Sequence, residues 1–136
     1  MEITVTAGNG FIPSEISLYK EKEIIEIQQD DTSIRHVIVN APGEGFTFGL
    51  YNDTDIHYAN GTLLADNLIA EGTTSSDGTL SFEGYYPHGR YYIRELAAPD
   101  GWKLNTETFC FETKPADMAE DQKIRVSIEK VHDELI

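Results

Sequence analysis

The segment at residues 91–102, YYIRELAAPDGW, contains the side chain with the clearest chemical potential in this sequence, the carboxylate of Glu95. Side chains alternate between the two faces of a β-strand, so Tyr91, Ile93 and Glu95 share one face. The two apolar neighbours predict that this face points into a core. Burying a carboxylate without a partner is costly, so Glu95 needs either a structural partner or a chemical role.

A second group of polar side chains begins at Asn52. Asn52, Asp53 and Asp55 offer the oxygen atoms that calcium prefers, but the glycine and distal glutamate of an EF-hand loop are missing. A polar turn capped by Asx hydrogen bonds is the better interpretation. The four histidines also lack the spacing of metal ligands. The sequence therefore predicts no metal site and no cofactor.

Cys110, His36 and Asn40 are residue types that cysteine proteases use in catalysis. A reactive thiolate needs a helix N-terminus or a nearby cation. Cys110 instead lies between Phe109 and Phe111 in an expected strand, which favours a structural role. Since no nucleophile, base and oxyanion hole converge in the pattern, we predict that the chain is not an enzyme.

Alternating apolar residues separated by turn residues predict an all-β chain. The expected strands are residues 3–7, 16–28, 34–40, 46–51, 63–71, 78–82, 91–96, 108–112 and 124–130. Asn60-Gly61 and Asp77-Gly78 are typical of hairpin turns, and short strands at this spacing predict an antiparallel β-sandwich. One helical turn is expected near residues 116–121. The expected core residues are Phe46, Phe48, Leu50, Leu80, Phe82, Tyr91, Ile93, Phe109, Phe111, Val126 and Ile128.

The composition narrows the class of partner. Ten basic and 24 acidic residues give a net charge of -14, which argues against binding to nucleic acid or to anionic membranes. The single cysteine excludes an internal disulfide. No apolar run is long enough to cross a membrane.

Several motifs in order resemble one known family. They are GFTFGLY at residues 45–51, TTSSDGTLSFEG at 73–84, HGRYYIRELAAPDGW at 88–102, and a Phe-x-Phe strand at Phe109 and Phe111. This order is similar to the Cna-B domains, also called SpaA-type prealbumin-like domains, of Gram-positive surface proteins and pilins. The resemblance covers roughly residues 45–130 and implies a prealbumin-like β-sandwich.

Many members of this family carry an internal isopeptide bond, and the resemblance implies the residues that would form one. A lysine on the first strand attacks an asparagine or aspartate on the last strand, and a buried glutamate between them promotes proton transfer. Glu95 matches the glutamate position. No amide lies near Ile128 on the expected last strand, and residues 34–40, taken as the first strand, hold no lysine. We therefore predict that the family's Lys–Asn bond is absent. With these partners missing, no residue of the chain is predicted to be catalytic.

Two alternatives for Glu95 remain open at this stage. Lys20 or Lys22, in the expected strand at 16–28, are candidates to meet Asn40 or Glu95 and form an isopeptide. The favoured interpretation is a structural carboxylate that accepts backbone N–H bonds or pairs with His36, Arg35 or Arg94. Lys20 and Lys22 then belong to a solvated edge.

A faint internal repeat suggests how the chain is divided. Residues 7–11, AGNGF, resemble residues 98–102, APDGW, at an offset of about 90 residues, the size of one such domain. We expect an N-terminal strand segment at 1–43 that resembles the back half of a preceding repeat. A sandwich at 44–131 and a linker at 132–136 follow it.

The expected function is that of a structural stalk or spacer at the bacterial cell surface, whose first and last strands run side by side. Its partners would be neighbouring domains of the same protein, and a strand-swapped dimer is a further arrangement to consider. The alternative is an adhesin that recognises a glycan or a host protein through exposed aromatic residues. The contact point expected for that role is Tyr85 and Tyr86.

Overall fold

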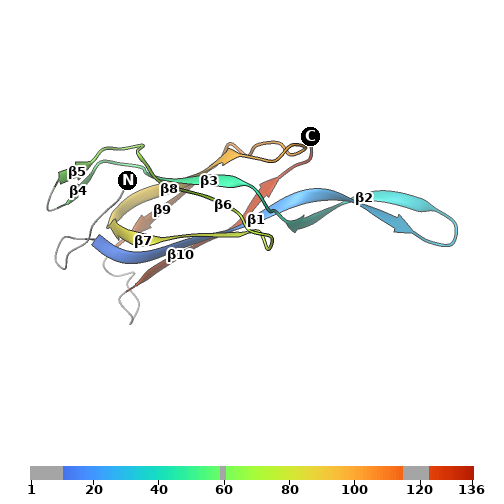
Figure 1. Ribbon diagram of the computed structural model, residues 1–136, viewed down its shortest axis with the longest axis horizontal. Coiled ribbons are helices and arrows are strands. Elements are labelled where there is room, and N and C mark those ends of the chain that lie inside the picture. The colour runs from blue at the N-terminus through green and yellow to red at the C-terminus, as the bar shows by residue number, and fades with distance from the viewer. Residues whose placement is uncertain (1–10, 59–60, 115–122) are drawn as a thin grey trace.

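The computed structural model describes residues 11–58, 61–114 and 123–136 of this chain. These residues form ten β-strands, shown in Figure 1, and no helix. The strands are β1 (Phe11–Gln29), β2 (Ile34–Pro42), β3 (Thr47–Asn52), β4 (Ile56–Tyr58), β5 (Gly61–Leu63), β6 (Leu68–Thr73), β7 (Thr79–Pro87), β8 (Gly89–Ala97), β9 (Thr108–Thr113) and β10 (Ile124–Asp133). The expected strand at 3–7 and the helical turn near 116–121 lie outside the described residues.

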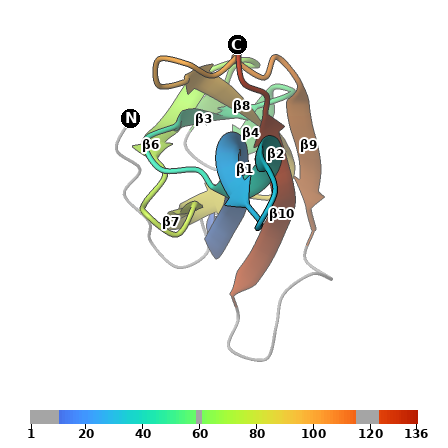
Figure 2. The same cartoon turned by 90° about the vertical axis from the view of Figure 1, so that its right-hand side faces the viewer.

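Two sheets face each other across the core (Figure 2). One sheet has the order β6-β3-β8-β9, and β4 and β5 form a separate hairpin. The other sheet is built on β1, which pairs with β7, β10 and β2. The all-β sandwich predicted from the alternation of apolar residues is confirmed.

The long strand β1 organises its sheet. It pairs antiparallel with β7 over Phe11–Tyr19 and parallel with β10 from Ser14 to Lys22. Glu21 then pairs with both His132 of β10 and Pro42 of β2, so β2 follows β7 along the same edge of β1. The first and last described strands therefore lie side by side and point the same way.

The core forms where alternate side chains of the two sheets meet. Six of the residues expected in the core are buried there, namely Phe46, Phe48, Leu50, Phe82, Tyr91 and Ile93. The other five pack against it while partly buried: Leu80, Phe109, Phe111, Val126 and Ile128. The chain adds Ile16, Leu18, Ile56, Leu63, Ile69, Tyr86 and Val131, which the sequence analysis did not include.

The second half of β1 and all of β2 form a hairpin that projects beyond the sandwich (Figure 1). Ile25 pairs with Ile38, Ile27 with His36 and Gln29 with Ile34, which places four isoleucines on one face. These isoleucines are 61 to 65% exposed. We call the hairpin from Glu23 to Asn40 the isoleucine arm.

The arm corrects one expectation. Residues 34–40 were taken as the first strand of the sandwich, but β2 is the outer strand of the arm, and β1 occupies the place beside β10. The described part of the 1–43 segment thus pairs with β7 and β10 of its own chain. The division of the chain at residue 43 and the relation to a preceding repeat stay predictions.

The polar segment at Asn52 has a structural role. The buried Asn52 side chain donates to the carbonyl oxygens of Thr54, Leu63 and Leu64, and its Oδ1 accepts from the Asn67 N–H. These bonds hold the β4–β5 hairpin against β3. Among the residues described, no three metal-ligating side chains gather in one place.

Replacing an apolar residue with alanine should destabilise the fold much more in the core than on the exposed face of the isoleucine arm. Phe48→Ala leaves a cavity in the core and should lower the free energy of unfolding by about 3–5 kcal/mol. Ile38→Ala, on the exposed face of the arm, should change it by less than about 0.5 kcal/mol. Guanidinium denaturation of both variants beside the parent measures the difference. Comparable losses would show that the arm is packed in solution.

Candidate functional site

Three ionisable side chains meet inside the sandwich: Lys20 of β1, Glu95 of β8 and Asp133 of β10. The Nζ atom of Lys20 lies 2.5 Å from Asp133 Oδ1 and 3.1 Å from Glu95 Oε1. All three side chains are fully buried, with no exposed area. We call this cluster the buried triad. It joins the two sheets, since β8 belongs to one and β1 and β10 belong to the other.

The alternation of β1 turns Lys20 inward. Ile16 and Leu18 are buried core residues, and Lys20 follows in the same phase. Its ammonium group lies 4.7 Å from the centre of the Phe46 ring, which gives a favourable cation–π contact. A Cβ atom at Gly43 would come within 2.7 Å of the Lys20 side chain, so glycine leaves room for the lysine.

A β-bulge turns Asp133 inward. Leu18 pairs with Ile128 and Lys20 with Val131, so one strand has an extra residue between these pairs. Lys130 takes up that residue in the left-handed region, with φ of 59°. The bulge reverses the phase of β10, because Ile124 is buried before it and Val131 and Asp133 are buried after it.

Glu95 continues the inward phase of Tyr91 and Ile93 on β8, as the alternation predicts. Its Oε2 accepts the backbone N–H of Asn105 at 2.8 Å. Burial, reinforced by a hydrogen bond with Asp133, raises the pKa of Glu95 to about 7, although Asn105 and Lys20 oppose the shift. Glu95 is therefore poised to hold a proton near neutral pH.

A single added proton on Glu95 would give a hydrogen bond to the two oxygens of the triad that lack one. Glu95 Oε1 and Asp133 Oδ2 are buried oxygens without a hydrogen-bond donor. A protonated Glu95 that donates to Asp133 Oδ2 pairs both atoms at once. The arrangement therefore holds an amine against a carboxyl group while a neighbouring acid polarises that carboxyl group, which is the geometry for forming an amide.

The structure brings together two of the four isopeptide candidates, Lys20 and Glu95. Lys22 instead lies 4.6 Å from the centre of the Trp102 ring, and Asn40 is exposed on the isoleucine arm, where it pairs with Glu23. Trp102 also donates its Nε1–H to the carbonyl oxygen of Glu23, which fixes the base of the arm.

Of the partners expected for Glu95, the backbone N–H donor is present at Asn105, but the three expected side-chain partners are wrong. His36 and Arg35 are exposed on the arm, and the Arg94 guanidinium bonds the Tyr51 hydroxyl group at 3.1 Å. Asp133 was missed because it fell in the expected linker at 132–136. The available signal was Val131, an apolar residue one position out of phase with Val126 and Ile128, which indicates a bulge.

The remaining candidate residues do not gather into a site. Tyr86 is buried, so only Tyr85, 50% exposed, is available at the expected contact point. Cys110 is a free thiol on the exposed side of β9. The part of the chain that the structure describes has no helix able to cross a membrane.

Comparison with known proteins identifies the class. The SpaA prealbumin-like fold domain matches residues 39–130, most of the chain. The chain belongs to this family, as its sequence motifs indicated. No curated protein sequence matches it.

Solved structures agree on the fold. The major pilin SpaD of Corynebacterium diphtheriae is 19% identical with a TM-score of 0.55, over 90% of this chain and 32% of SpaD. The TIE protein of Bacillus anthracis is 22% identical with a TM-score of 0.54, over 92% of this chain and 18% of that protein. The T6 backbone pilin of Streptococcus pyogenes is 25% identical with a TM-score of 0.50, over 78% of this chain and 17% of the pilin. The chain thus spans a third or less of each.

The raised pKa of Glu95 predicts how stability depends on pH when Lys20 is replaced. Lys20→Met removes a cation that lowers the pKa of Glu95. In the folded variant this pKa should therefore be about 7 or above, compared with 4.5 in the unfolded chain. The folded protein then binds the proton more tightly than the unfolded chain. The free energy of unfolding should fall by about 3 kcal/mol as pH rises across that window.

Denaturation of Lys20→Met at a series of pH values measures this slope. The matched control is the double variant Lys20→Met/Glu95→Gln, which has no titrating group at position 95 and should lose most of the slope. Identical pH profiles for the two variants would contradict the assignment of the proton to Glu95.

Proposed function

We propose that this domain is a load-bearing module of a Gram-positive surface protein or pilin, and that it locks itself with an isopeptide bond between Lys20 and Asp133. The observation that carries the proposal is the buried triad, in which Lys20 Nζ lies 2.5 Å from Asp133 Oδ1 with Glu95 beside both. The bond is Lys–Asp, which differs from the Lys–Asn pair that the sequence analysis expected to be absent.

The reaction starts by passing one proton from the Lys20 ammonium to the Asp133 carboxylate. Burial favours this transfer, because a neutral amine and acid cost less in a dry core than two charges. The Lys20 nitrogen then attacks Cγ of Asp133 and forms a C–N bond. Holding the two groups in contact replaces a bimolecular encounter with an intramolecular step.

Glu95 supplies the acid–base chemistry. In its protonated form it donates to Asp133 Oδ2, which draws electron density from Cγ as the nitrogen attacks. The attacking nitrogen loses a proton, and the departing Asp133 oxygen gains one and leaves as water when its C–O bond breaks. Glu95 acts as the carrier between them and regains its proton at the end. The products are an amide and one water molecule.

The position of the bond suits a module under tension. β1 and β10 are parallel neighbours, so pulling on the start of β1 and the end of β10 shears their hydrogen bonds together. A covalent bond from Lys20 to Asp133 crosslinks these strands near the end of their pairing. The pilins among the similar structures support a role in a longer chain of domains at the cell surface.

The alternative function, recognition of a glycan or host protein by aromatic residues, has less support. Tyr51 and Tyr92 stack on each other at 5.0 Å and are buried, as is Tyr86. Tyr85 alone remains exposed at the expected contact point, and a single ring does not make a sugar-binding platform.

Intact mass spectrometry of the denatured protein tests the bond. The parent protein should be lighter than its sequence by one water, because amide formation releases one. Lys20→Arg, Asp133→Ala and Glu95→Gln should each keep the full sequence mass. Lys22→Arg, two residues further along β1, is the matched control and should lose the water as the parent does. A folded parent of full sequence mass would sink the proposal.

The bond should also raise stability. Lys20 and Asp133 are 113 positions apart, and crosslinking a loop of that size stabilises by roughly 5 kcal/mol in the chain-entropy model. Guanidinium denaturation should therefore show Lys20→Met less stable than the parent by about this amount or more. Lys22→Met loses only a half-buried cation–π contact with Trp102 and should differ by at most about 2 kcal/mol. Equal losses in both variants would speak against a crosslink.

A further inference from the structure

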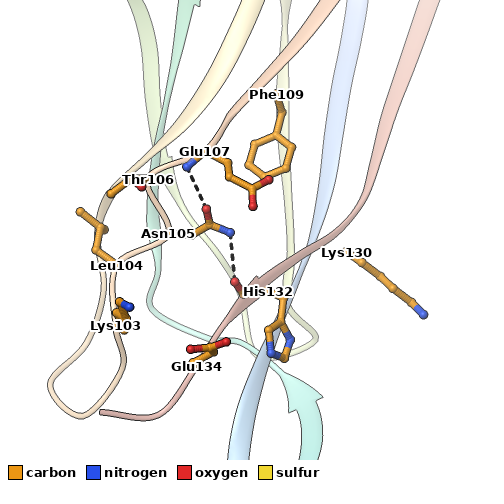
Figure 3. A pocket seen from close by; sticks show the side chains of 9 residues that line it. All are labelled: Lys103, Leu104, Asn105, Thr106, Glu107, Phe109, Lys130, His132 and Glu134. Atoms are coloured by element: carbon orange, nitrogen blue, oxygen red, sulfur yellow. Dashed lines mark hydrogen bonds between the residues drawn. The ribbon is translucent and has the colours of Figure 1, made fainter.

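We propose, on the basis of the function proposed above, that Asn105 is a positioning residue that aligns Glu95 with Asp133 for the crosslinking reaction. Asn105 lies in the loop between β8 and β9, in the wall of a surface pocket of about 360 Å³ shown in Figure 3. Its hydrogen bonds go to Glu95, His132 and Glu107. Its contacts reach both of the strands that supply the carboxyl groups.

Asn105 makes three hydrogen bonds with three different atoms. Its backbone N–H donates to Glu95 Oε2 at 2.8 Å, and its Nδ2 donates to the carbonyl oxygen of His132 at 3.0 Å. Its Oδ1 accepts the backbone N–H of Glu107 at 2.9 Å, which closes an Asx turn. Figure 3 shows the side chain between Glu107 and His132.

These bonds add to a short backbone bridge between the two sheets, where Trp102 pairs with Leu135 and the Lys103 N–H donates to the Glu134 carbonyl oxygen. β8, which carries Glu95, pairs with β3 and β9, whereas β10, which carries Asp133, pairs with β1. His132 directly precedes Asp133. Asn105 therefore ties the Glu95 carboxylate and the backbone next to Asp133 to one rigid turn, which limits how far the two carboxyl groups drift apart.

The backbone bond also orients the Glu95 carboxyl group. Because Oε2 accepts the Asn105 N–H, the acidic proton belongs on Oε1, the oxygen that lies 3.1 Å from Lys20 Nζ. That is one of the two buried oxygens without a donor, and the other is Asp133 Oδ2. Asn105 thus places the Glu95 proton on the oxygen from which it can be donated to Asp133 Oδ2.

An asparagine suits this position because both ends of its amide are used. Asn105→Asp keeps an oxygen for the Glu107 N–H and so keeps the Asx turn, but it loses the donor to His132. Asn105→Ala loses both contacts and adds no charge. Thr106→Ala changes the neighbouring residue of the same loop and is the matched control.

The test follows bond formation in newly made protein. Full-length chains are produced by a short cell-free synthesis, translation is stopped, and portions are unfolded in acid at set times and weighed by mass spectrometry. Asn105→Asp and Asn105→Ala should both lose water roughly 10- to 100-fold more slowly than the parent. Thr106→Ala should match the parent, and circular dichroism should show all four proteins folded.

A pH series separates positioning from a general structural role. The Asn105 N–H lowers the pKa of Glu95, so a displaced loop lets that pKa rise. The pH at which the rate falls by half should therefore move upward in Asn105→Ala and stay unchanged in Thr106→Ala. A slower rate with an unchanged midpoint would make Asn105 a structural residue only.

The remaining outcomes distinguish failure of the positioning role of Asn105 from failure of the proposed crosslink. If the parent loses water and both Asn105 variants keep its rate, the positioning role is wrong and the crosslink stands. Slowing in Asn105→Asp alone indicates charge repulsion, slowing in Asn105→Ala alone indicates loss of the Asx turn, and either overturns the role. If the folded parent never loses water, the proposed function itself fails.

Discussion

The burial of Lys20 between two carboxyl groups is the constraint on which the rest of this structure depends. A lysine and an aspartate without exposed area are held 2.5 Å apart in an apolar core, where charges lose the hydration they have in water. Such a pair is often less stable than a hydrophobic one of the same size. In the reaction proposed above, conversion of the pair into an amide would remove both charges, so the cost of burial would help to drive bond formation.

The surrounding fold is arranged to keep those groups in contact. β1 brings Lys20 and β8 brings Glu95 by simple alternation, while β10 brings Asp133 only after the bulge at Lys130. The three strands belong to two sheets, so the packing of the sandwich sets the separation of the triad. A shift of one sheet against the other therefore changes the distances between Lys20, Glu95 and Asp133 directly.

The sequence predicted the parts of this fold that follow strict alternation. Glu95 could be placed in the core because Tyr91 and Ile93 precede it in phase. Lys20 followed Ile16 and Leu18 in the same way, but the acidic neighbours Glu21 and Glu23 suggested a solvated edge. Strict alternation could not place Asp133, because one extra residue in β10 reverses the phase, and the out-of-phase Val131 was the sign of it in the sequence. The arm was missed because a projecting hairpin and a sandwich strand have the same alternation.

The isoleucine arm begins just past Lys20 and ends well before Asp133. In the proposed crosslinked form, a stretching force that enters through β1 would cross the amide and leave through the end of β10. The residues between Lys20 and Asp133, including the arm, would form a covalently closed loop that carries none of this force. The arm therefore keeps its four isoleucines in the same arrangement whether the chain is slack or fully stretched.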